Sequence, residues 1–318
     1  MKVSVLLLSF NQADLIAAAI EGVINQKTNF SFELLISDDC SSDHSRSIIE
    51  DYHKRFPHVI KPFFQQENLG PKNNDYFLFQ KSQGEYLCYC EADDFWCNEN
   101  KLQMQVEFLD GHPDYGLVHG DVNFLFSDSG KFIQSYNKTN NIEVKSGDIY
   151  NELLLGNHYI KTMTVCYRKK IMADHYFTDD YIRNSNWMMI DLSQWLCIAS
   201  CSKIHYLKEV LATYRLRSES MSRSKSSLKM HHFHLDIFDI RFHFMQKYQK
   251  HSEATLARVN EMYVNMLVGD AYKLSDWKII KKAIQFARVK KVILKPKILI
   301  KLILLSVQVV FLGSKHQR

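Results

Sequence analysis

The sequence is poor in the residues and runs that mark several classes of protein. Its 318 residues include only 11 glycines and 5 prolines, which excludes collagen-like and low-complexity proteins. It contains no internal repeat, so a solenoid or propeller is excluded as well. With 46% hydrophobic and 24% charged residues, the chain fits one large globular domain, or one domain with an extension.

The cysteines do not form the pairs that metal or redox motifs use. The chain has 7 of them, an odd number, and none stands in a Cys-x-x-Cys pair. Cys88, Cys90 and Cys97 lie close together in the sequence, but no second pair of ligands lies near them, which argues against zinc. Buried thiols in a reducing compartment are the better interpretation.

The first residues resemble the start of a signal peptide, but the resemblance ends early. The apolar run from Val3 to Leu8 stops at Ser9, and no small-residue cleavage site follows it. We therefore predict that this run is the first strand of a sheet.

Charge is distributed unevenly along the chain. Acidic residues are absent from Lys281 onward, where the chain carries ten Lys or Arg, so the remainder of the chain is net acidic. The segment 292–318 is both basic and apolar, but its uninterrupted part, 302–313, is shorter than the about 20 residues of a membrane span. We expect this tail to lie on an anionic membrane surface. The alternative is a helix packed back on the domain.

Strand-like and helix-like stretches alternate four times in the first hundred residues. Continuous apolar runs predict strands, and the 3.6-residue spacing of apolar residues predicts helices between them. This alternation predicts a parallel sheet with right-handed crossovers. The expected strands are 3–8, 32–37, 59–64 and 86–90, and the expected helices are 14–26, one that starts near Ser41, and 76–82.

Polar and acidic side chains follow these strands. Ligands of open α/β sheets bind at the carboxyl ends of the strands, so we expect a polar, acidic rim at one edge of the sheet. Each residue alone could cap a helix, which is the role that we expect for Ser41 and Asp43. The residues of the predicted rim are Ser9, Asn11, Asp38, Asp39, Glu91, Asp93 and Asp94.

Three carboxylates follow the fourth strand almost without a gap. Glu91, Asp93 and Asp94 come directly after an apolar run and before Phe95 and Trp96. Clustered carboxylates repel one another, and a hard divalent cation relieves that repulsion. An acidic loop that caps the following helix is the alternative.

Further candidates lie in the second half of the chain. Asp191 stands at the head of an apolar helix, where capping that helix is the simpler role. Arg215 and Arg217 lie among serines after a strand, which suggests a phosphate clamp or a solvated basic loop. Helices are expected at 228–249, 256–274 and 277–289. His231, His232 and His234 in the first of them do not all lie on one face, which argues against a metal site.

Several ordered motifs together resemble the inverting family 2 glycosyltransferases of the GT-A fold. The resemblance covers about residues 1–222. Its motifs are Ser9-Phe10-Asn11, the run from Asp38 to Asp43, Asn68-Leu69-Gly70, the run from Gly84 to Trp96, Lys101-Leu102, Asp191 and Tyr214-Arg215.

The resemblance implies a role for each matching residue. Asp39, with Asp38, would bind the nucleobase of a sugar donor near Phe10 and Asn11. Glu91, Asp93 and Asp94 occupy the family's Asp-x-Asp motif and would hold Mg²⁺ or Mn²⁺ against the diphosphate. Asp191 would be the catalytic base. The other residues assigned to the nucleotide are Ser9, Asn68, Lys72 and Ala92, and those assigned to the diphosphate or acceptor are Arg215, Arg217 and Trp96.

The sequence also departs from the family pattern at three places. Glu91 replaces the first Asp of the metal motif, Arg217 stands where relatives often carry His, and Leu8-Ser9 replaces the usual Pro-Thr.

These inferences define an expected architecture and function. The fold class is α/β, with a mostly parallel, Rossmann-like GT-A sheet flanked by helices and a C-terminal helical extension. We expect a glycosyltransferase domain at 1–222, with a nucleotide-binding half (1–110) and an acceptor half (111–222), then a helical extension at 223–291 and the tail. The expected activity is inverting, metal-dependent sugar transfer to a glycan or lipid-linked glycan, in bacterial surface polysaccharide synthesis at the cytoplasmic face of the membrane.

Two other functions fit parts of the pattern. A sugar nucleotidyltransferase needs a similar sheet and metal, but it should carry a glycine-rich, basic loop after the first strand, which is absent here. A non-catalytic carbohydrate-binding protein on the same scaffold is the other, and the intact acidic set argues against it.

Overall fold

The computed structural model describes residues 1–157, 160–217 and 225–293, which form parts of two compact units. The first, here called the sheet unit, comprises Met1–Ile149, His158–Ser185 and Cys197–Ser218. The second, the helical unit, comprises Tyr150–Asn157, Asn186–Leu196 and the chain from Glu219 onward. Two short segments from within the range 1–222 therefore belong to the helical unit.

The sheet unit is built on a nine-stranded mixed sheet in the described residues, with the order β3-β2-β1-β4-β8-β6-β9-β5 and β7 paired to β6. The first four strands are parallel, as the alternation of strands and helices predicts. Beyond β4 the pairing changes, because β8 is antiparallel to both β4 and β6, whereas β9 runs parallel to β6. The strands are β1 (Val3–Ser9), β2 (Phe32–Asp38), β3 (Ile60–Phe64), β4 (Tyr86–Tyr89), β5 (Phe95–Trp96), β6 (Tyr115–Phe126), β7 (Phe132–Ile133), β8 (Cys166–Arg168) and β9 (Lys203–Leu216).

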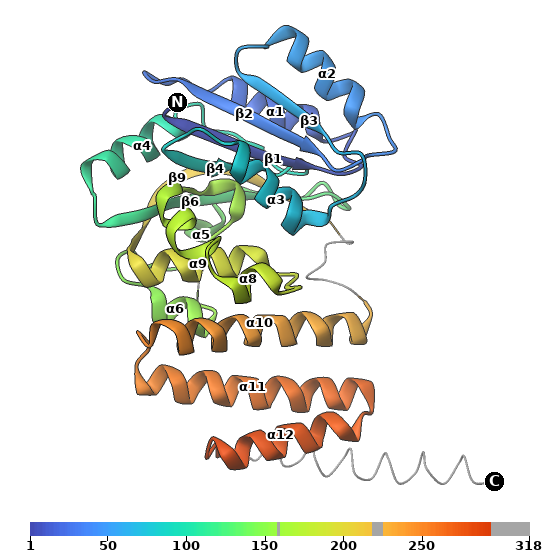
Figure 1. The fold of residues 1–318 in the computed structure, drawn as a ribbon, viewed down its shortest axis with the longest axis vertical. Coiled ribbons are helices and arrows are strands. Elements are labelled where there is room, and N and C mark those ends of the chain that lie inside the picture. Colours follow the sequence, from blue (N-terminus) through green and yellow to red (C-terminus); the bar gives the residue numbers. More distant parts are fainter. Residues whose placement is uncertain (158–159, 218–224, 294–318) are drawn as a thin grey trace, which may run out of the picture. The chain divides into compact units, whose positions relative to one another are not determined.

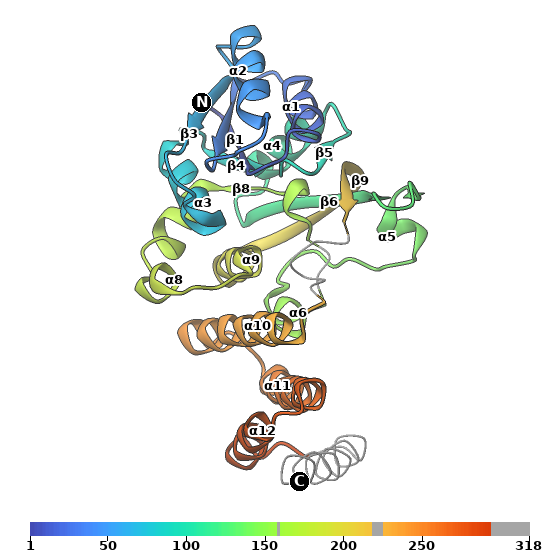
Figure 2. The same ribbon diagram turned by 90° about the vertical axis from the view of Figure 1, so that its right-hand side faces the viewer.

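Helices cover both faces of the parallel strands (Figure 2). One apolar cluster joins α1, α2 and α4 to alternate residues of β1, namely Val3, Val5 and Leu7. Helix α3 contacts β1 and β2 from the opposite face, where the intervening Leu6 is also fully buried. The helices of this unit include α1 (Ile16–Ile24), α2 (Ser45–Arg55), α3 (Gly70–Lys81), α4 (Lys101–Gly111), α5 (Tyr136–Thr139), α7 (Lys169–Ile171) and α8 (Asp180–Asn184).

The turn before β4 passes very close to β1. A Cβ atom on Gly84 would lie 2.3 Å from the backbone nitrogen of Ser4, so only glycine fits at this position. Next to it, the buried carboxylate of Glu33 accepts hydrogen bonds from the Ser4 hydroxyl at 2.6 Å and the Gln83 amide at 3.0 Å, and it pairs with Lys61. This network fixes β1, β2 and the start of β4 in one register.

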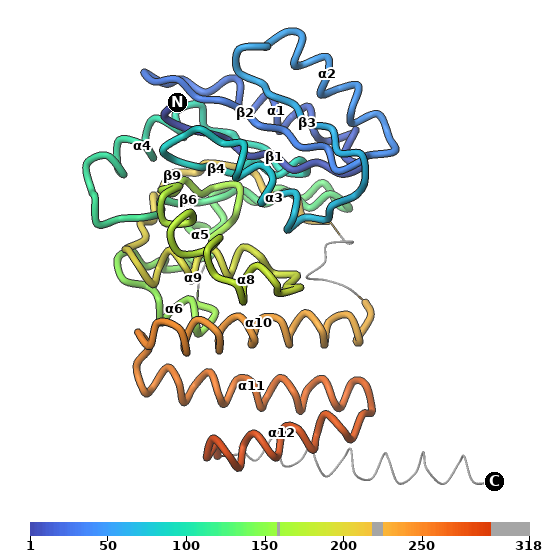
Figure 3. The backbone as a smooth tube through the Cα atoms, in the orientation of Figure 1, coloured from blue at the N-terminus to red at the C-terminus, as the bar shows by residue number. Residues whose placement is uncertain are grey.

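The helical unit contains three long helices in succession, α10 (Ser227–Tyr248), α11 (Glu253–Leu274) and α12 (Trp277–Val289). Each begins at a side-chain cap, from Ser226, Ser252 and Asp276 respectively. Figure 1 shows α11 between α10 and α12, with successive helices running in opposite directions, and the tube in Figure 3 traces the short connections between them. The unit also includes α6 (Tyr150–Leu155) and the start of α9 (Ile190–Cys201).

Membrane contact was predicted for the tail at 292–318, and almost all of that segment lies outside the described residues. Among the helices that the structure does describe, none combines the length and the apolar character needed to cross a bilayer.

Candidate active site

The carboxyl ends of β1 and β2 lie side by side at one edge of the sheet. Ser9 and Asp38 are directly paired in the parallel register, and β4 ends at Tyr89, which pairs with Leu6. The polar residues that follow these strands therefore gather at the same edge, as the sequence predicts.

Side-chain hydrogen bonds tie the loop after β1 to the loop after β2. Asn11 has a positive φ of 52°, which Asn tolerates better than most residues. Its backbone N–H donates to Ser41 Oγ, and its side-chain oxygen accepts the N–H of Ser42, both at 2.9 Å. Asp43 accepts the N–H of Ala13 at 2.9 Å. Ser41 and Asp43, which the sequence suggested as helix caps, thus shape this edge of the sheet.

The two acids after β2 have different local partners. Asp38 accepts hydrogen bonds from the hydroxyl and the N–H of Ser41. Asp39 lies at the start of α3, where its two carboxylate oxygens accept the N–H groups of Leu69 at 2.7 Å and Gly70 at 3.0 Å. A helix N-terminus stabilises a carboxylate in this position. Each Asp39 oxygen still has a lone pair that can accept a further hydrogen bond, as the predicted contact with a nucleobase requires.

This contact of Asp39 also explains why α3 begins at Gly70, well before the predicted start at Tyr76. Asn68 supports the same turn, because its side-chain oxygen accepts the Gly70 N–H at 3.1 Å and its amide donates to the Asp39 carbonyl at 3.3 Å. The helix start depends on groups 30 residues apart, which a local sequence pattern does not reveal.

The acidic turn after β4 points its carboxylates in different directions. Glu91 and Asp93 are half-buried, whereas Asp94 is only 1% exposed. Asp94 Oδ1 accepts the backbone N–H of Arg215 at 2.6 Å, and the Arg215 guanidinium donates to the Asp93 carbonyl at 3.1 Å. Burial, together with the negative charges of Glu91 and Asp93, raises the pKa of Asp94 well above its ordinary value.

The pairing of β5 with β9 brings these groups together. Phe95 pairs with Thr213 and Trp96 with Ala212, so the turn before β5 lies beside the end of β9. The Arg215 guanidinium also lies 4.6 Å from the centre of the Phe95 ring. Arg215, predicted to lie near the diphosphate, is therefore held against the acidic turn.

The oxygen donors of this turn suit a divalent cation, although they do not form a complete site. Among residues 1–157, 160–217 and 225–293, no group of three or more His, Cys, Asp or Glu side chains has a geometry that could hold a metal ion. Glu91 and Asp93 are the carboxylates of this turn that could ligate a cation, because Asp94 is enclosed. Mg²⁺ commonly takes one or two protein carboxylates and completes its shell with phosphate oxygens and water, so this pair fits a cation shared with a diphosphate.

Three other predicted site residues have partners within the sheet unit. Arg217 donates to the side-chain oxygen of Gln12 at 3.2 Å, which links the end of β9 to the loop after β1. The Lys72 ammonium donates to the carbonyls of Ile182 at 2.7 Å and Arg183 at 3.1 Å, at the end of α8. Trp96 is 4% exposed, and its indole N–H donates to the Tyr89 carbonyl at 3.1 Å.

These contacts limit which of the predicted residues can reach a nucleotide or an acceptor. The Lys72 ammonium is occupied at α8, and Trp96 forms part of the core, as does the buried Ala92. Ser9, Phe10 and Asn11 differ in exposure, with Ser9 buried and the Phe10 ring 47% exposed at the edge of the sheet.

Asp191 lies in the first turn of α9, in the part of that helix that belongs to the helical unit. Its Oδ1 accepts the N–H of Leu192 at 2.7 Å. The side chain is partly exposed.

Sequence reasoning missed Gln12 and Asp75. Asp75 is 5% exposed and accepts a hydrogen bond from the Tyr89 hydroxyl at 2.5 Å, below the acidic turn. The available signal was an acid at the end of a polar stretch and directly before the apolar run from Tyr76 to Phe79, because buried acids almost always have a partner. Gln12 gave no such signal, since its contact with Arg217 spans 205 positions of the chain.

A family model for glycosyl transferase family 2 matches residues 4–175, which is more than half of the chain. The chain belongs to glycosyl transferase family 2. The resemblance drawn from the motifs is thereby confirmed, and the matched range contains every residue assigned to the nucleotide and to the metal, whereas Asp191, Arg215 and Arg217 lie beyond it.

Curated relatives of the chain include an uncharacterised protein and two proteins named as glycosyltransferases. An uncharacterised Mycobacterium tuberculosis protein is 30% identical over 225 residues, which are 70% of this chain and 60% of that protein. TuaG of Bacillus subtilis, named as a candidate teichuronic acid biosynthesis glycosyltransferase, is 27% identical over 70% of this chain and 82% of its own. The Escherichia coli UDP-Glc:α-D-GlcNAc-diphosphoundecaprenol β-1,3-glucosyltransferase WfgD is 24% identical over 70% of this chain and 80% of its own.

Solved structures confirm the GT-A fold. Staphylococcus aureus TarS 1-349, in complex with UDP-GlcNAc, matches with a TM-score of 0.54 and 17% identity over 91% of this chain and 88% of that chain. The mannosyltransferase PcManGT of Pyrobaculum calidifontis, in complex with GDP-Man and Mn²⁺, matches with a TM-score of 0.56 and 13% identity over 96% of this chain and 86% of that chain.

Proposed function

We propose that this family 2 glycosyltransferase transfers a sugar from a nucleotide-diphosphate sugar to a glycan or lipid-linked glycan, with inversion at the anomeric carbon. The observation that supports this most directly is the edge of the sheet, where Asp38 and Asp39 lie at the end of β2 and Glu91 and Asp93 follow β4, the two strands that flank β1. Structures of the same fold bind UDP-GlcNAc and GDP-Man, which supports a nucleotide-sugar donor.

The proposed chemistry is a single displacement. Asp191 takes the proton of an acceptor hydroxyl, whose oxygen attacks the anomeric carbon of the donor. The bond between that carbon and the diphosphate oxygen breaks on the opposite face, and the nucleoside diphosphate leaves. One such displacement inverts the configuration.

The residues of the sheet unit supply binding and charge. Asp39 accepts a hydrogen bond from the nucleobase through its remaining lone pairs, and the loops tied together by Asn11 and Ser41 support that base. Glu91 and Asp93 would hold Mg²⁺ or Mn²⁺, which stabilises the charge that develops on the departing diphosphate. Arg215 adds positive charge next to the same turn, and Arg217 adds it beside the loop after β1.

The proposed setting is bacterial surface polysaccharide synthesis at the inner face of the cytoplasmic membrane. TuaG and WfgD are named for the assembly of surface or lipid-linked glycans, which supports this setting. At the end of the described chain, Ile293 is 87% and Val289 is 68% exposed, next to Lys290 and Lys291. Such a basic, apolar end suits an anionic lipid surface, and deletion of 292–318 should release the protein from phosphatidylglycerol vesicles.

Calorimetry with a panel of nucleotide sugars, with and without Mn²⁺, tests the proposal. We expect one donor to bind in the presence of the cation and to release its nucleoside diphosphate when an acceptor is added. NMR of the product should show the anomeric configuration opposite to that of the donor. Asp191→Asn should abolish transfer with nearly unchanged donor binding, and near-normal turnover by this variant would disprove the assignment of the base.

A further inference from the structure

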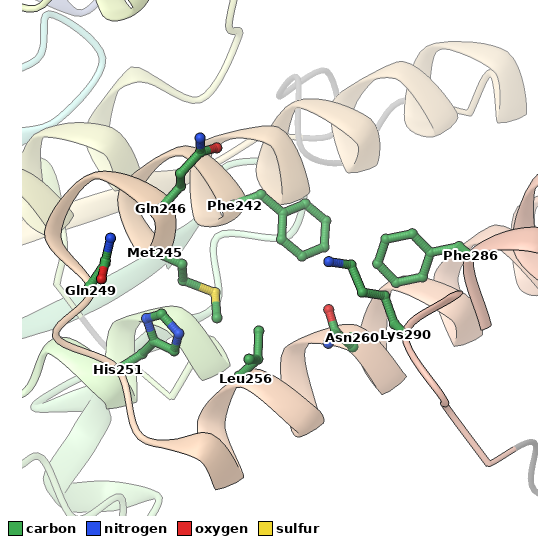
Figure 4. A pocket seen from close by; sticks show the side chains of 9 residues that line it. All are labelled: Phe242, Met245, Gln246, Gln249, His251, Leu256, Asn260, Phe286 and Lys290. Carbon is green, nitrogen blue, oxygen red and sulfur yellow. The ribbon is translucent and has the colours of Figure 1, made fainter. Parts of the chain in front are cut away.

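The helical unit contains a cavity of about 610 Å³ at α10, α11 and α12, and none of the residues that line it is assigned to the donor (Figure 4). Its volume lies within the range of about 300–1,000 Å³ that is usual for small-molecule sites. Six of the residues that line it carry the argument, and they are Phe242, Gln246, His251, Asn260, Phe286 and Lys290.

Two buried polar atoms of this cavity have no hydrogen-bond partner in the described parts of the chain. They are Oδ1 of Asn260, whose side chain is 5% exposed, and Nδ1 of His251. An unpaired buried polar atom destabilises a fold, and native proteins have few of them. Both residues lie at the cavity in Figure 4, so a bound group with hydroxyls, which donate and accept, would satisfy them.

Aromatic rings form part of the apolar wall of the cavity, together with Met245 and Leu256. The Phe242 and Phe286 ring centres lie 5.8 Å apart, with the ring planes inclined at 41°. An acyl chain could pack on these rings, but it would leave Gln246, His251 and Asn260 facing hydrocarbon, which is costly for unpaired polar groups. A sugar ring presents C–H groups to an aromatic face and hydroxyls to the amides, so it fits both parts of the wall.

One cation lines the same cavity, and further cations lie in the segment to which it belongs. Lys290 lines it, and the segment from Trp277 to Ile293 contains no acidic residue. The exposed cations of that segment are Lys278, Lys281, Lys282, Arg288, Lys290 and Lys291. A ligand of complementary charge is therefore anionic.

We propose that this cavity binds an acidic glycan, meaning a sugar chain with carboxylate or phosphate groups. Within the function proposed above, on which this inference rests, the bound glycan is a part of the acceptor chain that does not itself react. Binding at such a second site would favour acceptors that are long and negatively charged.

Binding of an oligogalacturonate to the full-length protein, measured by calorimetry, tests this site. A neutral malto-oligosaccharide of equal length is the control for the negative charge. Polyglutamate, which is negatively charged but is not a sugar, is the control for the sugar. We expect the oligogalacturonate to bind at least tenfold more tightly than either control. Equal binding of polyglutamate would mean that only charge is recognised, and absence of oligogalacturonate binding would mean that no such site exists; either result would overturn the proposal.

Asn260→Leu supplies the matched variant, because leucine has a similar size and no unpaired oxygen. It should weaken oligogalacturonate binding at least tenfold while the free energy of unfolding stays equal or rises. Asn265→Leu on the same helix, where Asn265 lines a different cavity, should bind like the wild type. Unchanged oligogalacturonate binding by Asn260→Leu would overturn the site. A variant that binds oligogalacturonate normally but binds phosphatidylglycerol vesicles more weakly would overturn it as well, because the cavity would then bind lipid.

The proposed transferase function is tested separately by donor binding to the wild-type protein. Donor binding without glycan binding would reject only the second site. Glycan binding without binding of any nucleotide sugar would instead reject the proposed transferase function.

Discussion

The backbone N–H of Arg215 donates to Oδ1 of Asp94 at 2.6 Å, and the Arg215 side chain donates back to the carbonyl of Asp93 at 3.1 Å. This reciprocal contact joins the end of β9 to the acidic turn after β4. It gives the two neighbouring aspartates different surroundings, because Asp94 is enclosed and Asp93 is half-exposed.

Replacing Asp94 by Ala should therefore destabilise the fold. The Arg215 N–H would remain buried without an acceptor, which costs about 1–3 kcal/mol. Asp94→Asn retains an acceptor oxygen and should lose less. Urea unfolding followed by circular dichroism measures both variants, and equal stability of Asp94→Ala and the wild type would show that this contact contributes nothing.

The same difference predicts separate effects on cation-dependent nucleotide binding. Asp93→Asn should weaken nucleotide binding in Mn²⁺ by at least tenfold, because it removes a charged donor from the open side of the turn. Asp94→Asn should have the smaller effect. Titration with UDP or GDP at fixed Mn²⁺ compares the two variants. A larger loss of nucleotide affinity for Asp94→Asn would show that Asp94, and not Asp93, holds the cation.

Asp39 should prove important for folding as well as for the nucleotide. Asp39→Ala leaves the N–H groups of Leu69 and Gly70 without their acceptor at the start of α3, which should cost about 1–2 kcal/mol. Hydrogen exchange should show faster exchange at these two amides. If they exchange at the wild-type rate while nucleotide binding is lost, Asp39 acts on the ligand alone.

These cases show how far the sequence leads. The parallel pairing of β1, β2 and β4 follows from apolar runs that end in polar residues, so the location of the edge was predictable. Glu91, Asp93 and Asp94 look alike in sequence, and only the pairing of Phe95 with Thr213 decides which carboxylate is enclosed. Contacts between distant parts of the chain carry no local signature, which is why the partners of Asp39 and Arg217 were not foreseen.

Lys72 illustrates the same point and gives a further prediction. It was assigned to the nucleotide, yet its ammonium donates to Ile182 and Arg183 carbonyls at the end of α8, and burial lowers its pKa. Lys72→Met should increase hydrogen exchange in residues 180–185. Nucleotide affinity should change less than for Asp93→Asn, and a larger loss of affinity without a change in exchange would restore the original assignment.

Lowering the pH should destabilise the sheet unit, because Glu33 then becomes protonated. Burial alone would raise the pKa of Glu33, but hydrogen bonds from Lys61, Ser4 and the Gln83 amide lower it below its ordinary value. An acid whose pKa is lowered by folding stabilises the folded state at pH values above its pKa in the unfolded chain, about 4.3 for Glu. This contribution is lost as the pH falls through the lower pKa of the folded state.

Glu33→Gln should accordingly lower the free energy of unfolding at pH 7, by about 1–3 kcal/mol. The difference from the wild type should shrink as the pH falls below about 4.3. Unfolding by urea at pH 7, 5 and 3.5 would measure this trend, and a difference that is constant with pH would exclude Glu33 as the titrating group.

The hydrogen bonds between the loops after β1 and β2 have a thermodynamic consequence. Asn11, Ser41 and Asp43 make these bonds within the chain itself, so the loops lose their conformational entropy when the protein folds. A ligand that meets this edge does not have to order it, and more of the interaction free energy remains as affinity. The association rate at this edge is then set by diffusion and orientation of the ligand rather than by closure of the loops.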